Sequence, residues 1–330
     1  MLAYLARRLV QMVVVLLAIS VVTFGLFYAA PRDPARQACG PTCDPTRIDA
    51  LRHSMGLDQP IATQYLEYMR GIVLGREIRD VDGSMIDCSA PCLGYSYYLH
   101  QPVLDAIVGR FPATLSLAAG ALAVVVALGV TSGFVSALRR GSLSDRFLSM
   151  FTLVGASVQI YFLGYVLQYY LVYQTGLFPT PGYTPLTEDP LEWLRGLLLP
   201  WLVLGFVQAA VYARIARSQM LETMGEEYVR TGRSKGLGWW RNHLRYTSRG
   251  AAAPLVQLIC LEVGTLLGGA VITETVFGVN GIGQLSLDAI TQNDLPTVVG
   301  TVMLAAFVVV LFVAVADLVI AYLDPRVRLN

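Results

Sequence analysis

Four of the five cysteines in this chain form two pairs with the same short spacing. Three residues separate Cys39 from Cys43, and three separate Cys88 from Cys92. Thiols spaced in this way can close disulfides or, as a set of four, ligate a metal ion. An oxidising compartment favours disulfides, and we then expect the local pairs Cys39–Cys43 and Cys88–Cys92. The fifth, Cys260, lies in an apolar run, where a small buried side chain is the expected role.

The other residues that could do chemistry do not form a catalytic set. The three histidines, His53, His100 and His243, are far apart in the sequence. Of the 24 basic residues only Lys235 is a lysine. It follows a serine and precedes a glycine, so the Gly-Lys-Ser/Thr step of a phosphate-binding loop is absent. We therefore expect a chain that is not an enzyme and holds no cofactor or metal, and any ATP-driven step requires a separate subunit.

A basic stretch between two apolar runs is the most distinctive feature of the sequence. Residues 227–254 read E-Y-V-R-T-G-R-S-K-G-L-G-W-W-R-N-H-L-R-Y-T-S-R-G-A-A-A-P and contain six basic residues. The segment Met224–Ser234 has no proline and can form a short helix, which Gly236 and Gly238 would end. A solvated connecting loop is the alternative interpretation. The spacing instead favours a short surface helix that a partner can hold.

Composition indicates the elements that must position this helix. The chain is 55% hydrophobic and only 14% charged, which is typical of a polytopic membrane protein. We predict an all-α protein with a first transmembrane helix at residues 1–30 and a core at 111–325. The core carries a cytoplasmic loop at 219–250 and five further spans, at about 112–137, 147–172, 197–216, 254–272 and 298–322.

The first apolar run could instead be a signal peptide. It is longer than the apolar region of a typical signal peptide, and Pro31 directly follows Ala30, which favours an uncleaved span. Residues 31–110 are polar and predict a small insert outside the membrane, with an amphipathic helix at Ile61–Leu74. Within the spans, Gly129 and Gly133 form a GxxxG pair that would let two helices approach closely.

The distribution of arginine and lysine predicts the orientation of the spans. With six spans, both chain ends lie on one side together with residues 138–146 and 214–250. That side holds 15 basic residues, whereas the other holds 9 basic and 16 acidic residues over a longer length. The positive-inside rule therefore predicts that both ends and the basic stretch are cytoplasmic, and that the insert is extracytoplasmic.

The basic stretch also resembles a known sequence signature. Residues 230–237 read R-T-G-R-S-K-G-L, which is similar to R-T-A-R-A-K-G-L in ABC-transporter permeases of the dipeptide, oligopeptide and nickel group. In that family the loop, called the EAA loop, carries a coupling helix that sits in a groove on the ATPase subunit. The matching positions here are the EAA residues Arg230, Thr231 and Gly232, the loop glycine Gly236, and the later proline Pro254.

The resemblance extends along the chain. It includes Phe111-Pro112-Ala113-Thr114, the Arg139-Arg140-Gly141-Ser142 turn with Asp145-Arg146, the segment from Gly269 to Gly283, and the C-terminal Leu323 to Arg328. Gly232 replaces the usual alanine and should loosen the helix by about 1 kcal/mol. Gln159 replaces the usual proline, and this loss should straighten the third span locally and alter the pathway beside it.

One carboxylate in a predicted span, Glu262, needs an explanation of its own. A charge at the bilayer centre is costly, so Glu262 should face protein or water and have a partner. It could line the translocation path, as could Gln159. It could equally be a protonated or paired group that locks two helices together, and the sequence leaves both open.

The resemblance implies a type I ABC importer permease fold and a set of partners. These are a second homologous permease in a heterodimer, two ABC ATPase subunits that bind ATP and Mg²⁺, an extracytoplasmic substrate-binding protein and membrane lipid, with no nucleic acid. ATP binding would close the ATPases, and the coupling helices would transmit this motion to the spans. The residues assigned to the coupling loop are Glu227, Tyr228, Arg230, Thr231, Gly232, Arg233, Lys235, Gly236 and Leu237.

Peptides are the commonest cargo of the family, and the expected location is a bacterial cell membrane. An importer of a nickel chelate, haem or another small solute is an alternative within the same group. A secondary transporter is a second alternative, but it should show inverted repeats, and none is convincing here. A membrane anchor or receptor subunit is a third, and it leaves the basic stretch unexplained.

Overall fold

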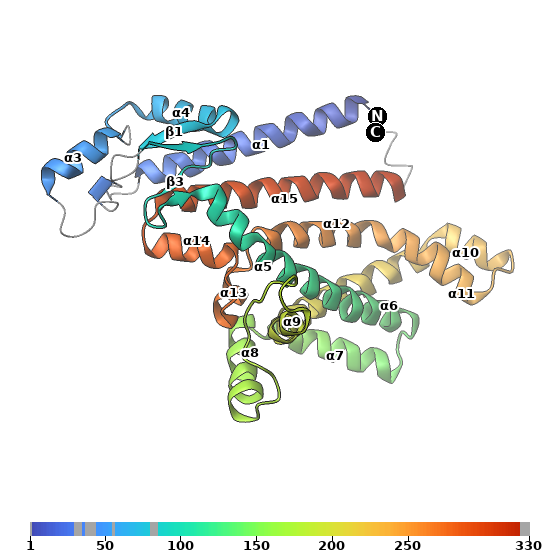
Figure 1. Cartoon of the computed structure of the whole chain (residues 1–330). Coiled ribbons are helices and arrows are strands. Elements are labelled where there is room, and N and C mark those ends of the chain that lie inside the picture. The colour runs from blue at the N-terminus through green and yellow to red at the C-terminus, as the bar shows by residue number, and fades with distance from the viewer. Residues whose placement is uncertain (1, 30–34, 37–43, 55–56, 80–84, 324–330) are drawn as a thin grey trace. The chain divides into compact units, whose positions relative to one another are not determined.

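The structure is a computed structural model that describes residues 2–29, 35–36, 44–54, 57–79 and 85–323 (Figure 1). The chain divides into two compact units. Unit 1 comprises Met1–Thr114, Leu267–Val271 and Asn280–Val310, and unit 2 comprises Leu115–Leu266, Ile272–Val279 and Leu311–Asn330. The expected pair Cys39–Cys43 and the C-terminal family tail from Asp324 lie outside the described residues.

Unit 1 contains the first span and the insert. Its helices are α1 (Leu2–Ala29), α3 (Pro45–Ser54), α4 (Ile61–Leu74), the first part of α5 (Val103–Val124), α14 (Ile282–Thr291) and the first part of α15 (Leu295–Leu323). Two antiparallel strand pairs accompany them, β1 (Arg76–Arg79) with β2 (Met85–Cys88), and β3 (Tyr95–Ser96) with β4 (Gln101–Pro102). The amphipathic helix expected at Ile61–Leu74 is α4, which packs on α1: the Ser20 and Tyr65 hydroxyls are 2.7 Å apart.

The core of unit 1 joins the start of α5 to α14. Val103, Ile107, Ile282 and Leu285 are buried together there. The backbone N–H of Ile282 donates to the Thr114 hydroxyl at 2.8 Å, which satisfies a donor at the first turn of α14. Residues far apart in the sequence are thus held in one packed cluster.

The short β3–β4 pair is attached to the start of α15 by a buried carboxylate. Ser96 and Thr297 both donate hydroxyl hydrogen bonds to Oδ2 of Asp294, each at 2.5 Å. Burial is the main cause that raises the pKa of Asp294 above its usual value, and the two hydroxyl donors offset part of this rise. Gly94 lies next to the same helix, since a Cβ added to it would be 3.2 Å from Cβ of Pro296.

The regular elements of unit 2 are all helices among its described residues, and the loop 175–189 separates two of them. After the end of α5 it contains η1 (Val125–Val130), α6 (Thr131–Leu138), α7 (Leu143–Ser157), α8 (Ile160–Leu167), η2 (Gln168–Gln174), α9 (Pro190–Gly225), α10 (Glu227–Ser234), α11 (Trp239–Arg241), η3 (Asn242–Thr247), α12 (Ser248–Leu267), α13 (Val271–Phe277) and the end of α15. Here η marks π-helical segments. Figure 1 shows α10 and α11 side by side at one end of α12.

Helix α9 is the element on which unit 2 is built. The predicted GxxxG pair packs against it: a Cβ on Gly129 would lie 2.9 Å from Cα of Ala209, and one on Gly133 would lie 2.5 Å from the Ala213 carbonyl oxygen. Gly120 faces the ring of Trp201 so closely that no side chain fits between them. The prediction that Gly129 and Gly133 serve close helix packing is therefore confirmed.

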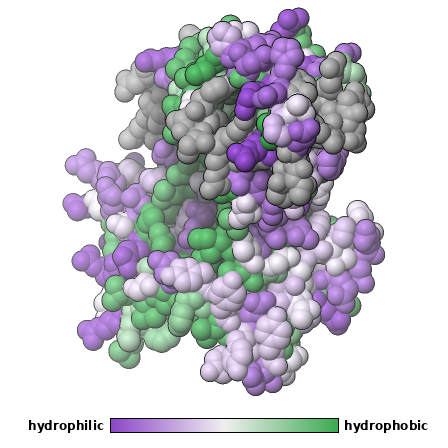
Figure 2. Space-filling model, turned by 90° about the vertical axis from the view of Figure 1, so that its left-hand side faces the viewer, coloured by the Kyte–Doolittle hydropathy of each residue, from purple (hydrophilic) through white to green (hydrophobic). Residues whose placement is uncertain are grey.

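Five described helical stretches are long and apolar enough to cross a membrane, Arg7–Leu26, Val103–Leu138, Pro190–Gly225, Ser248–Leu267 and Leu295–Tyr322. A sixth span exists if the bent pair Leu143–Ser157 and Ile160–Gln174 is counted as one. Large apolar side chains are exposed on these helices, such as Leu9 and Val10 on α1, as suits contact with lipid. Figure 2 likewise shows hydrophobic residues exposed over part of the surface.

The third predicted span, 147–172, is the one that the structure corrects. The two halves of this span meet at 96°. We expected the absence of proline at Gln159 to straighten it, and that expectation was wrong. Val158 (φ −86, ψ 127) and Gln159 (φ −76, ψ 135) are both extended, and two consecutive extended residues end a helix whether or not one is proline.

Candidate functional site

The basic stretch forms a compact helical hairpin, residues 227–247, which we call the handle. It follows α9, whose 36 residues extend about 54 Å, well beyond the roughly 30 Å of a bilayer's hydrocarbon core. Glu226 interrupts the helix with an extended backbone (φ −65, ψ 145), and α10 begins at the next residue. A rigid helix long enough to leave the membrane therefore leads into the handle.

Helix α10 ends in a Schellman motif around Gly236. The N–H of Leu237 bonds to the carbonyl of Gly232 at 3.2 Å, and the N–H of Gly236 bonds to that of Arg233 at 3.0 Å. Gly236 has φ +79, a left-handed conformation that glycine adopts without strain. The glycine just past the helix was identified from the sequence, and the structure places it at the predicted turn.

The second half of the handle packs on α10 through a buried asparagine. Nδ2 of Asn242 donates to the carbonyl of Val229 at 3.3 Å, and both residues are buried. His243 is buried beside Asn242, and its ring lies 4.8 Å from that of Trp239. Burial, with a smaller contribution from Arg233, lowers the pKa of His243 below 6.5. Sequence reasoning missed these two residues, because their only signal was two polar positions within a basic run.

The outer face of α10 carries charges that the described part of the chain does not neutralise. Arg230, Arg233 and Lys235 are exposed, and none has an ion pair among the described residues. Glu227 lies in the first turn of the helix and Arg233 in the last, as the helix dipole favours. Thr231 is also exposed, and its hydroxyl bonds back to the Glu227 carbonyl at 2.9 Å.

The inner face of α10 fixes its position. Val229 is 1% exposed, whereas Tyr228 is 40% exposed. A Cβ on Gly250 would lie 2.3 Å from the Tyr228 hydroxyl oxygen, so this tyrosine reaches across to α12. Helix α10 thus contacts both α9 and α12, which are two candidate spans.

Gly232 does more than loosen the helix. An added Cβ would lie 2.9 Å from Oδ1 of Asn242 and 3.2 Å from Cδ1 of Leu237. The glycine thus makes room for the second half of the handle. Our expectation that alanine would only stabilise this position was incomplete, because it considered helix propensity without packing.

The two pathway candidates lie in different settings. Gln159 is exposed at the bend between α7 and α8. Glu262, on α12, is half-buried and accepts a hydrogen bond from Nε2 of Gln208 on α9 at 2.5 Å. No described contact joins the two candidates. For Glu262 the partner now identified favours the interpretation as a group that links two helices.

A second polar connection in unit 2 was not predicted. Asp145, near the start of α7, accepts from Nε and Nη2 of Arg217 at 2.8 and 3.0 Å, and from the Ser136 hydroxyl. The backbone N–H of Gly141 adds a fourth hydrogen bond at 2.9 Å. The signal that could have found it is the Ser142-x-x-Asp145 helix start, since the N–H of Asp145 donates to Ser142 at 3.2 Å.

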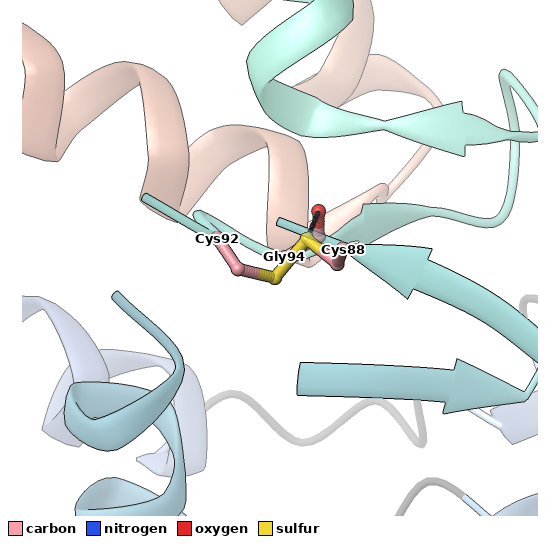
Figure 3. The surroundings of a disulfide bond; sticks show 3 residues. All are labelled: Cys88, Cys92 and Gly94. Atoms are coloured by element: carbon pink, nitrogen blue, oxygen red, sulfur yellow. Dashed lines mark hydrogen bonds between the residues drawn. A yellow bond between two sulfur atoms is a disulfide. The ribbon is translucent and has the colours of Figure 1, made fainter. Parts of the chain in front are cut away.

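Cys88 and Cys92 are bonded in the insert, with an S–S distance of 2.03 Å (Figure 3). Both are buried, at 2% and 0% exposure. Sγ of Cys88 lies 3.9 Å from the Gly94 carbonyl oxygen, a contact rather than a hydrogen bond because a disulfide sulfur carries no proton. Among the described residues, no group of three His, Cys, Asp or Glu side chains could hold a metal ion.

Two family descriptions match this sequence. Residues 1–118 match the N-terminal region of the membrane component of binding-protein-dependent transport systems. Residues 129–329 match the inner membrane component of the same systems. The chain belongs to this family. It is therefore a bacterial inner membrane component, and the family description itself names a binding protein as a partner of such systems.

Relatives match this inner membrane component over nearly its whole length. A probable peptide ABC transporter permease of Sinorhizobium fredii is 32% identical over 98% of this chain and 99% of its own. The di/tripeptide transport system permease of Pseudomonas aeruginosa is 34% identical, and the dipeptide transport system permease of Escherichia coli 33% identical, each over 99% of both chains.

A solved structure resembles the fold of this inner membrane component. It is an inward-facing form of the MetNI methionine ABC transporter, which matches with a TM-score of 0.51 at 16% identity. The match covers 67% of this chain and 97% of the other. At this identity the likeness shows the fold alone, and it supports the predicted importer permease fold.

Proposed function

We propose that this chain forms half of the translocation pathway of an ATP-driven importer of short peptides, and that the handle couples it to a separate ATPase. The observation that carries the proposal is the geometry of α10. Its inner face is held by Val229 and Tyr228, and its outer face presents Arg230, Arg233 and Lys235 without partners among the described residues. A helix of this kind suits a groove on another protein.

The peptide substrate follows from the relatives. Those in Sinorhizobium fredii, Pseudomonas aeruginosa and Escherichia coli are named for peptide, di/tripeptide and dipeptide transport. Their likeness covers the spans as well as the handle, so a cargo of similar size and polarity is the best supported one. A nickel chelate or haem is the alternative cargo, and nothing in the described residues favours it.

The proposed assembly has this chain, a second homologous permease, two ATPase subunits and an extracytoplasmic binding protein. ATP binding draws the ATPases together and moves each handle, and α9 and α12 carry the motion into the membrane. Hydrolysis reverses it. ATP and Mg²⁺ are bound by the ATPase subunits, and this chain performs no covalent step in the cycle.

The test is ATP hydrolysis by the purified complex in proteoliposomes with its binding protein. Di- and tripeptides should raise the hydrolysis rate and accumulate inside the vesicles. A nickel chelate and haem, supplied at the same concentration, serve as matched alternative cargoes. If either of these stimulates hydrolysis and peptides do not, that compound and not a peptide is the substrate. Purification of the chain with no ATPase subunit from its native membrane would refute the assembly.

A further inference from the structure

A cavity of about 440 Å³ lies in unit 2 among α6, α7 and α9. Serine, threonine and arginine side chains line it together with apolar residues, among them Leu148, Leu153 and Leu221. Its lining residues on α9, from Ala213 to Leu221, follow the apolar part of the helix and precede the handle. The cavity therefore lies toward the end of the spans that we predict to be cytoplasmic, at the depth of lipid head groups.

Most polar groups of the cavity are already engaged. Ser132 donates to the Gly129 carbonyl at 3.0 Å, and Thr152 donates to the Ser149 carbonyl at 2.8 Å. Ser136 and Arg217 are both committed to Asp145. The charge of Arg217 is thus neutralised by Asp145, and its guanidinium donates two hydrogen bonds to this carboxylate and one to the Ser136 hydroxyl.

Three donors of the cavity remain available. Among the described residues, Arg214 has no ion pair, and the hydroxyls of Ser149 and Ser218 have no hydrogen bond. One uncompensated guanidinium with two hydroxyls is a donor set that suits a phosphate group, whose oxygens only accept. A cavity between spans with this character on the cytoplasmic side is typical of anionic lipid sites.

The surface beside the cavity indicates which phosphate compound it takes. Leu153 lines the cavity and is 61% exposed. Met150 and Val154, next to it on α7, are 68% and 55% exposed. A free phosphate ion would leave these side chains uncovered, whereas the acyl chains of a phospholipid would lie along them.

We propose that the α6–α7–α9 cavity binds the head group of an anionic phospholipid, with Arg214, Ser149 and Ser218 contacting its phosphodiester. The acyl chains cover the apolar face of α7 at Met150, Leu153 and Val154. Because Arg217 and Asp145 hold α9 to α7 at the same place, the bound lipid stabilises the end of α9 that leads to the handle. The site is independent of what the protein transports.

The test compares lipid retention by the full-length protein, with its co-purifying subunits, in nanodiscs of phosphatidylcholine and phosphatidylglycerol. Phosphatidylglycerol retained after exchange into detergent is counted by native mass spectrometry. The substitution Arg214→Gln should lower retention about fivefold, since one arginine near an anionic surface contributes about that factor. Arg195→Gln is the matched control, because Arg195 is exposed at the other end of the same helix and lines no part of the cavity.

A second variant, Ser149→Ala with Ser218→Ala, should lower retention while leaving the charge unchanged. Equal retention by wild type and Arg214→Gln, or equal loss in Arg195→Gln, would overturn the proposal. Competition experiments with the wild-type protein identify the ligand. Displacement of phosphatidylglycerol by inorganic phosphate alone would show a free-anion site, and displacement by a dipeptide would show a substrate site. Retention unaffected by either, but lost in both cavity variants, supports a lipid site.

Discussion

The side-chain amide of Asn242 donates a hydrogen bond to the backbone carbonyl of Val229 at 3.3 Å, which ties the two halves of the handle together. Both residues are buried, in a segment whose other polar side chains are mostly exposed. The handle therefore has a small core of its own.

Gly232→Ala should fail to stabilise the handle. Alanine in an exposed helix usually gains about 1 kcal/mol over glycine. Here its Cβ would crowd Asn242 and Leu237, at 2.9 and 3.2 Å, so the expected result is a loss of about 1 kcal/mol. Hydrogen exchange of residues 227–247 measures it. Gly225→Ala is the control, because Gly225 is helical and its Cβ would meet nothing; equal protection in both variants would argue against the packing.

Gly236→Val should uncouple the complex without preventing its insertion. Gly236 has φ +79, and a β-branched residue there costs at least about 1–2 kcal/mol, which opens the turn that ends α10. ATP hydrolysis should persist while peptide accumulation falls several-fold. Gly238→Val is the matched control, since Gly238 has φ −58 and equally open surroundings. Transport at the wild-type rate in Gly236→Val would remove this glycine from the mechanism.

Glu262 should tolerate loss of its charge but not of its oxygen. Glu262→Gln keeps a carbonyl oxygen that can accept from Gln208, whereas Glu262→Leu leaves that half-buried amide unpaired at a cost of about 1 kcal/mol. The glutamine variant should therefore transport normally, and the leucine variant should unfold at a lower temperature. If the glutamine variant folds normally but does not transport, the charge itself is needed in the pathway.

The handle should lose stability in acid through His243. Burial lowers the pKa of this imidazole below 6.5, its ordinary value. At a pH between these two pKa values, His243 is protonated in the unfolded segment and neutral in the folded one. Local stability is therefore highest above pH 6.5 and decreases as pH falls through this window. Hydrogen exchange of residues 239–247, corrected for intrinsic rates, checks this. His243→Asn should abolish the pH dependence, and an unchanged slope in that variant would exclude His243 as its cause.

Much of the handle could be predicted from its sequence because its signals are local. The helix, its stop at Gly236 and its exposed charges depend on residues within a few positions of one another. Asn242 and Val229 are 13 residues apart, and nothing in the sequence indicates that they pair. The same holds for Gly232, whose role depends on Asn242 lying against it.

The membrane part shows the same division between local and distant signals. Apolar runs predicted the spans, and the Gly129–Gly133 spacing predicted close packing. The bend at Gln159 was missed, because the expectation relied on proline alone as the cause of a break. The Asp145–Arg217 pair joins residues 72 positions apart, and no local pattern identifies such a partner.

Photo-crosslinking from the handle tests the central claim most directly. A photoreactive amino acid replaces Arg230 or, as control, Leu186, which is exposed in the loop before α9 and predicted to lie on the opposite side of the membrane. In the intact complex, position 230 should form an adduct with an ATPase subunit and position 186 should not. An adduct between position 230 and the extracytoplasmic binding protein, or none with any subunit of an active complex, would contradict the account.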